Sequence, residues 1–224
     1  LEGNVATSGN GGAVAIADLS VNAVGTSVVN NFVIGNAAGS SGGGVWCDAS
    51  LGAIDVAHNT LVANAAQASG GGVHLGACNG SLSNNAVVSS LSGQGVFCTT
   101  EAVFTIDGND IWSNAGGEWT GCLPTLTDVS VDPGFAPPAC SAPDYHLVPG
   151  SAVRDVGVNG VASQPAIDIE GGMRIVDGDG DGTAVADVGA DEWSCEDLDG
   201  DGFDSCTLPP DCDDRDASVN PHAT

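Results

Sequence analysis

The sequence predicts an all-β fold, a parallel β-helix whose short strands wind into stacked coils, followed by an irregular module rich in acidic residues. Three observations predict the coils: a recurring segment, a glycine content far above ordinary usage, and apolar residues that alternate in short runs. The recurring segment begins at an apolar residue and ends three residues later at asparagine. Its copies are Leu1–Asn4, Val33–Asn36, Leu61–Asn64 and Ile111–Asn114, with Val87–Ser90 as a diverged copy. The units are therefore 24 to 32 residues long, which is typical of solenoids, propellers or arrays.

Among these architectures the composition favours a β-solenoid. The glycines disfavour a helical solenoid, and a propeller blade needs four strands and about 40 residues. Each unit instead holds three short apolar segments, as in 45–47, 54–56 and 61–63. Inward side chains of successive coils stack about 4.8 Å apart, so the same residue type recurs at each level. We expect one such stack to contain Val14, Val45, Val73 and Val96.

An asparagine also stands two residues before the apolar position of each later unit. We expect these asparagines to lie at a bend that needs a left-handed backbone conformation, which asparagine tolerates well, and to bond along the stack through their amides. This predicted structural ladder consists of Asn31, Asn59, Asn85 and Asn109.

Two segments after the coils carry a resemblance to a known family. Residues 144–157, which begin with Asp-Tyr-His-Leu, and residues 168–193 resemble the conserved tail of right-handed parallel β-helix repeat proteins of secreted bacterial type. The resemblance covers roughly residues 1–193 and implies a right-handed coil. The resemblance gives little information about function, because the same scaffold carries pectin and alginate lyases, hydrolases and adhesins. The last thirty residues resemble another module, the acidic metal-binding repeat of bacterial surface proteins, akin to thrombospondin type 3 repeats.

These observations divide the chain into three parts. We expect coils over residues 1–125, a tail that caps the β-helix and contains the first Asp-rich loop over 126–193, and an acidic calcium-binding repeat over 194–224. Leu1 aligns with the start of a third strand, so we expect either that the chain is a fragment or that another chain stacks on its open coil. The single acidic repeat suggests that the natural chain continues.

The charge is strongly acidic and unevenly distributed. The chain has no lysine, three arginines and 29 acidic residues, which gives a formal charge of −26. This charge excludes nucleic acid as a partner. Fifteen of the 29 acidic residues lie between Asp177 and Asp216. Carboxylates this close repel one another unless a cation neutralises them, and calcium is the natural candidate.

The spacing of two acidic loops supports calcium. Each loop has carboxylates at alternate positions and glycine at the sixth, where a calcium-binding loop must turn sharply. Neither has glutamate at position twelve, so other residues must supply ligands. The alternative is that this segment is a solvated acidic linker that binds no calcium. The expected ligands are Asp177, Asp179, Asp181 and Asp187, with Glu192, for the first loop, and Asp197, Asp199 and Asp201 with Asp204, Asp211, Asp213 or Asp214 for the second.

Eight cysteines point to disulfides and hence to an extracellular or cell-surface location. We expect pairs of sequence neighbours, Cys122 with Cys140 and Cys206 with Cys212. Cys47 and Cys98 are either disulfide-bonded or buried as small hydrophobic residues. A zinc site is not expected, because the sequence has no Cys-x-x-Cys motif. No stretch approaches the roughly 20 apolar residues of a membrane span.

No catalytic residue is assigned from the sequence. A lyase needs a lysine or arginine base, and the coils contain neither. A hydrolase needs paired carboxylates, for which Asp107 with Asp110 and Asp48 with Asp55 are weak candidates. Possible sugar-binding residues, each of which has ordinary packing as its simpler explanation, are His58, His74, Trp46, Trp112 and Trp119.

The sequence thus favours a structural or adhesive protein, stabilised by calcium, with carbohydrate or a second copy of itself as candidate partners. Stacking of copies end to end would produce fibres. The alternative is a fragment of a polysaccharide lyase or glycoside hydrolase.

Overall fold

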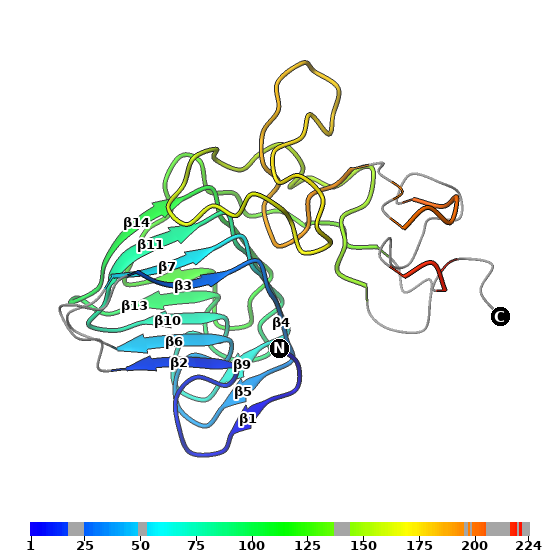
Figure 1. Ribbon diagram of the computed structural model, residues 1–224. Helices are drawn as coiled ribbons and strands as arrows, with labels where there is room; N and C mark the ends of the chain where they lie inside the picture. The colour runs from blue at the N-terminus through cyan, green and yellow to red at the C-terminus, as the bar shows by residue number, and fades with distance from the viewer. Residues whose placement is uncertain are drawn as a thin grey trace.

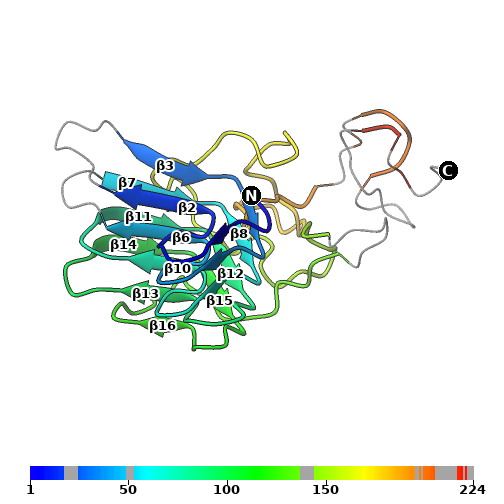
Figure 2. The same ribbon diagram turned by 90° about the horizontal axis from the view of Figure 1, so that it is seen from below.

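The computed structural model describes residues 1–17, 25–48, 53–136, 144–194, 197, 199–204, 216–218 and 220. Over these residues the chain forms β-strands and no helix. The strands wind into a parallel β-solenoid, with each coil paired to the next (Figures 1 and 2). The predicted β-helix is therefore confirmed.

Four parallel sheets run along the stack, and each takes one strand from successive coils. Sheet 1 contains β2 (Val14–Ala17), β6 (Val45–Asp48), β10 (Val73–Leu75), β13 (Val96–Cys98) and β16 (Trp119–Thr120). Sheet 2 contains β3 (Thr26–Val29), β7 (Ala53–Ala57), β11 (Asn79–Ser83) and β14 (Val103–Asp107). Sheet 3 contains β4 (Phe32–Ile34), β8 (Thr60–Val62), β12 (Ala86–Val88) and β15 (Asp110–Trp112). Sheet 4 contains the two-residue strands β1 (Val5–Ala6), β5 (Ala37–Ala38) and β9 (Ala65–Ala66), which were not predicted.

The core is a column of inward side chains in register. Val14 pairs with Val45, Val45 with Val73, and Val73 with Val96, as predicted. Val45, Val73 and Val96 have no exposed surface. Burial of each such side chain stabilises the fold by about 1.5–3 kcal/mol. The coils therefore hold one another by repeated apolar stacking.

The bend between sheets 2 and 3 differs in one detail from the prediction. The left-handed residue at each level is the one before the predicted asparagine, namely Asn30, His58, Asn84 or Gly108. Its φ is between 51° and 68°. Because the preceding residue makes the turn, the predicted asparagine is free to direct its amide along the stack.

Residues 128 and 129 of the tail bond to Asn109 and Ile111 of the last coil, while the rest of the described tail packs along the side of the solenoid (Figures 1 and 2). The reason is that sheet 3 is apolar on its outer as well as its inner face. Phe135 and Tyr145 of the tail pack on outward residues of this sheet. Leu147, Val153 and Val188 of the tail form a second cluster with Ala86. The outward residues they cover are Phe32, Ile34, Val62, Ala86, Val88 and Trp112.

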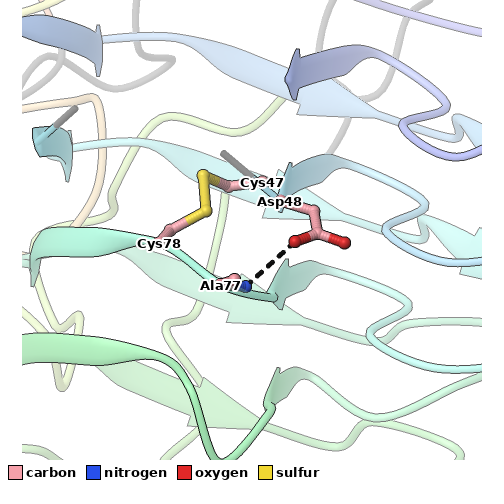
Figure 3. Close-up of a disulfide and its surroundings, with 4 residues drawn as sticks. All are labelled: Cys47, Asp48, Ala77 and Cys78. Carbon is pink, nitrogen blue, oxygen red and sulfur yellow. Dashed lines mark hydrogen bonds between the residues drawn. A yellow bond between two sulfur atoms is a disulfide. The ribbon is translucent and has the colours of Figure 1, made fainter. Parts of the chain in front are cut away.

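Two disulfides join neighbouring coils. Cys47 in β6 bonds to Cys78, the residue before β11, one coil further on (Figure 3). Cys98 in β13 bonds to Cys122, again one coil further on. The predicted Cys122–Cys140 pair is therefore wrong, because coil stacking brings Cys98 next to Cys122. Cys140, Cys206 and Cys212 lie outside the described residues.

Candidate functional site

The predicted asparagines form a continuous hydrogen-bonded ladder, the first asparagine ladder. The side-chain amides of Asn31, Asn59 and Asn85 each donate to Oδ1 of the next asparagine, at 2.9, 2.9 and 3.0 Å. The backbone N–H groups donate to the same oxygens. Asn109 ends the ladder by donating to a carboxylate oxygen of Asp128 at 2.9 Å. The ladder satisfies buried polar groups at every coil, so its role is structural.

A second asparagine ladder lies at the other end of sheet 3 and was not predicted. Asn4 donates to Asn36, and Asn36 to Asn64, at 2.9 and 3.0 Å. At the last coils Ser90 N donates to Asn114, which in turn donates to Glu118. The signal was present in the sequence, because these asparagines end the recurring segments.

The first acidic loop brings three carboxylates together. Ligand oxygens of Asp177, Asp179 and Asp181 lie within 4.8 Å of one another. The two oxygens of Asp177 accept hydrogen bonds from the backbone N–H groups of Gly180 and Gly182, at 2.8 and 2.9 Å. The loop therefore folds back on its first carboxylate and directs the other two toward it.

The second acidic loop repeats this arrangement. Asp197, Asp199 and Asp201 also place ligand oxygens within 4.8 Å of one another. Asp197 accepts hydrogen bonds from Gly200 and Gly202, at 2.7 and 3.0 Å. The two glycines that donate to the first aspartate have the same φ values in both loops. These values are 77° for Gly180 and Gly200 and 93° for Gly182 and Gly202. Asp211, Asp213 and Asp214 lie outside the described residues.

Asp187 and Glu192, expected to complete the first loop, accept backbone hydrogen bonds within the tail. Asp187 accepts hydrogen bonds from the backbone N–H groups of Asp155 and Trp193, both at 2.7 Å. Glu192 accepts from Val176 and from Asp187. Both side chains are buried, and burial raises the pKa of Asp187 to about 7 and that of Glu192 to about 9. These carboxylates bond within the tail, and their role as ligands of the first loop stays a prediction.

Arg174 lies at the centre of this part of the tail, with 1% of its surface exposed. Its guanidinium donates to the carbonyls of Gly189, Ala190 and Asp191. It lies 3.7 Å from Glu192, and its NH2 group donates to Asn30 in the solenoid. Most of its hydrogen bonds therefore go to backbone carbonyls.

His146 was not predicted from the sequence to be a site residue. Its Nδ1 lies 2.6 Å from Asp144 and its Nε2 lies 3.2 Å from Glu170. Burial alone lowers the pKa of His146, but the hydrogen bond to Asp144 and the charges of Asp191 and Glu170 raise it to about 10. The imidazole is therefore protonated at neutral pH and acts as a cation inside the tail.

A groove lies between the outer face of sheet 2 and residues 158–162 of the tail, with a volume of about 370 Å³. Asp55 and Asp107 both line it, from β7 and β14. The two pairs considered from the sequence were Asp107 with Asp110 and Asp48 with Asp55, and in each pair only one member lines this groove. The Oδ1 atom of Asp48 accepts a hydrogen bond from Ala77 at the disulfide corner (Figure 3). Asp110 is buried under the tail, which raises its pKa to about 7.

The histidines and tryptophans considered for sugar binding are dispersed. His58 is buried beside Asn84, and burial lowers its pKa to about 3. His74 stacks on Phe97, with the ring centroids 5.0 Å apart. Trp46, Trp112 and Trp119 do not form one platform. Trp46 stands level with His74 in sheet 1, Trp112 packs under the tail, and Trp119 packs against the core.

Comparison with known proteins gives one family. A family model described as disaggregatase related matches residues 45–170, more than half of the chain. The matched segment begins at β6 and includes the later coils, the groove and the first part of the tail. No curated protein and no solved structure matches the chain. Within the described residues, no helix is long and apolar enough to cross a membrane.

Proposed function

The chain belongs to the disaggregatase-related family, and from that premise we propose that it is a structural or adhesive β-helix protein of the cell exterior. In this proposal the acidic loops bind calcium and the solenoid presents surfaces to carbohydrate. Location outside the cell is supported by two disulfides between coils, since such bonds persist in oxidising compartments.

The observation that carries the calcium proposal is the repetition of one loop geometry. Two loops twenty residues apart share the same acidic spacing, the same glycine φ values and the same hydrogen bonds to the first aspartate. Clustered carboxylate oxygens are ligands suited to Ca²⁺. Calcium would supply the charge that lets these carboxylates approach. With dissociation constants of 0.1–1 mM, each site would stabilise the fold by about 0.4–1.4 kcal/mol at 1 mM calcium.

The test is a calcium titration followed by thermal unfolding. We expect chelation to lower the melting temperature, and most of that loss to disappear in a variant carrying D177N, D179N, D197N and D199N. Asp132→Asn is the matched control, because Asp132 is an exposed carboxylate outside both loops. Equal calcium responses in the wild type and the fourfold variant would contradict the proposal.

Assembly end to end is a further part of the proposal. β1 and β2 are edge strands of sheets 4 and 1, and Val5 in β1 is 64% exposed. An exposed edge strand can pair with another chain. Measurement of the molecular size in solution, with and without calcium, tests this assembly. A monomer in both conditions would contradict it.

One observation favours an enzymatic alternative, a polysaccharide lyase or glycoside hydrolase. The family description refers to a disaggregatase. Incubation with polyuronates, monitored for unsaturated products, tests the lyase. Incubation with neutral polysaccharides, monitored for new reducing ends, tests the hydrolase.

A further inference from the structure

We propose that the groove beside sheet 2 is a binding site for a neutral or amine-bearing sugar unit and that it rejects uronates. This inference rests on the proposed adhesive function and specifies the site and the ligand. It follows from how the groove is anchored, from the chemistry of its two walls, and from its charge.

The groove is held open by bonds at both ends of its tail wall. The side chain of Asn84 accepts a hydrogen bond from Val158 N and donates one to Val158 O, both at 2.9 Å. At the other end Ser163 donates to Asp55 at 2.7 Å. Asn159 fixes the wall from behind through bonds to Ala184 and Ala186. Because these contacts do not need a ligand, the site is formed in advance.

The two walls have different chemistry. The sheet wall carries Asp55, Ser81, Thr105 and Asp107, from three strands spaced about 4.8 Å apart. The tail wall is lined mainly by aliphatic side chains, those of Val158, Val161 and Ala162. A sugar ring has the matching character, since its hydroxyl or amino groups suit the polar wall and its C–H groups suit the aliphatic one. The volume lies within the range of about 300–1,000 Å³ for small-ligand sites.

Charge decides which sugars fit. None of the residues that line the groove is basic. Arg154 lies 3.8 Å from Asp155, and Arg174 is buried within the tail. A ligand carboxylate would therefore face Asp55 and Asp107 without a cation to neutralise it, whereas an amine would be attracted.

The geometry favours binding over hydrolysis. Asp55 and Asp107 stand on the same face but are separated by β11 and by two residues along the strand. This offset places their α-carbons roughly 12 Å apart. Glycosidase carboxylates are about 5–5.5 Å apart in retaining and about 6.5–9.5 Å apart in inverting enzymes. The pair is therefore better placed to contact neighbouring sugar units than to flank one glycosidic bond.

The experiment is calorimetric titration of the full chain at 1 mM calcium with three trimers, of glucosamine, N-acetylglucosamine and galacturonate. We expect the first two to bind and the third not to bind. Asp107→Asn should weaken glucosamine binding about tenfold, because it removes a charge-assisted contact, and should affect the N-acetylated trimer less. Ala162→Trp, at an exposed position on the tail wall, should abolish both. Asp132→Asn, outside the groove, should leave binding unchanged.

The outcomes separate the groove from the wider proposal. Trimer binding that persists unchanged in both groove variants would refute the groove while leaving an adhesive role. Absence of binding by the wild type to all three trimers would overturn the groove, and the calcium response would still be decided separately. Preference for the galacturonate trimer would contradict the charge argument. If Ala162→Trp lowers the melting temperature, its loss of binding does not test the groove, and the Asp107→Asn result alone decides whether the groove is the binding site.

Discussion

The guanidinium of Arg174 donates a 2.6 Å hydrogen bond to Oδ1 of Asn30, which precedes it by 144 residues. Asn30 is the left-handed residue between β3 and β4, and its own amide donates to the carbonyl of Ile167 in the tail. This reciprocal contact fastens the tail to the solenoid beside the outer face of sheet 3. The tail is thus part of the solenoid's lateral packing.

Replacement of Arg174 by methionine should destabilise the protein strongly. The variant would leave three buried backbone carbonyls without their donor, and each buried polar group left unpaired costs about 1–3 kcal/mol, so we expect a loss of at least about 3 kcal/mol. Urea unfolding at fixed calcium measures this. Arg154→Met is the control, since Arg154 is more exposed and lies over the Trp193 ring. Similar small losses in both variants would argue against a central role for Arg174.

Replacement of Asn85 by alanine should break the first asparagine ladder at its middle. The side chain is fully buried, and its amide donates to Val56, Ser83 and Asn109. Removal leaves buried polar groups unpaired, at a cost of about 1–3 kcal/mol for each. Denaturant unfolding should show a loss of at least about 2 kcal/mol. Asn79→Ala, at an exposed position on β11, should change stability little, and an equal loss there would contradict the ladder's importance.

Removal of either disulfide should destabilise the fold by a similar amount. The bonds close loops with sequence separations of 31 and 24 residues. The loop-entropy relation gives about 3.5 kcal/mol for each. Unfolding of the C47A/C78A and C98A/C122A variants measures the effect. Peptide mapping of the unreduced protein should recover Cys98 linked to Cys122, and recovery of Cys122 linked to Cys140 would refute the stacking assignment.

Stability should fall as the pH rises from about 6.5 to 10, in part because of His146. Its pKa is about 10 in the folded protein and 6.5 when unperturbed, so the folded state binds the proton more tightly. The stabilisation is complete below about pH 6.5 and is lost as the pH rises through about 10. His146→Gln should therefore show a shallower decline. Free energies of unfolding at several pH values measure the two slopes, and identical slopes would contradict the prediction.

The coils could be predicted because stacking requires similar residues at equivalent positions of successive coils. Each inward position meets the same position of the next coil, so Val45, Val73 and Val96 recur with the period of the coil. The first asparagine ladder recurs for the same reason. The left-handed residues were harder to assign, because Asn30, His58, Asn84 and Gly108 share only a backbone conformation.

The disulfide error has a physical cause. In most folds cysteines close in sequence are good candidates for a bond, and Cys122 and Cys140 fit that expectation. In a solenoid the spatial neighbours lie one coil apart, and the observed separations of 31 and 24 residues match the repeat length. The period that revealed the fold therefore also contained the connectivity.

The lateral position of the tail could not be predicted from local patterns. Phe32, Val62 and Val88 alternate with inward residues, and nothing in the strands shows that their outer faces are covered. The groove could not be predicted from local patterns either. Asp55 and Asp107 are 52 positions apart in the sequence and share a site only because β7, β11 and β14 are paired in register.

Hydrogen exchange of the whole chain, with 1 mM calcium and then with chelator, tests most directly the claim that a self-supporting solenoid carries calcium-ordered acidic loops. We expect chelation to speed exchange of the N–H groups of Gly180, Gly182, Gly200 and Gly202, which bond to the first aspartate of each loop. Exchange in β6, β10 and β13 should not change. Exchange at the four glycines that is the same in both conditions, or loss of protection throughout the coils on chelation, would contradict this account.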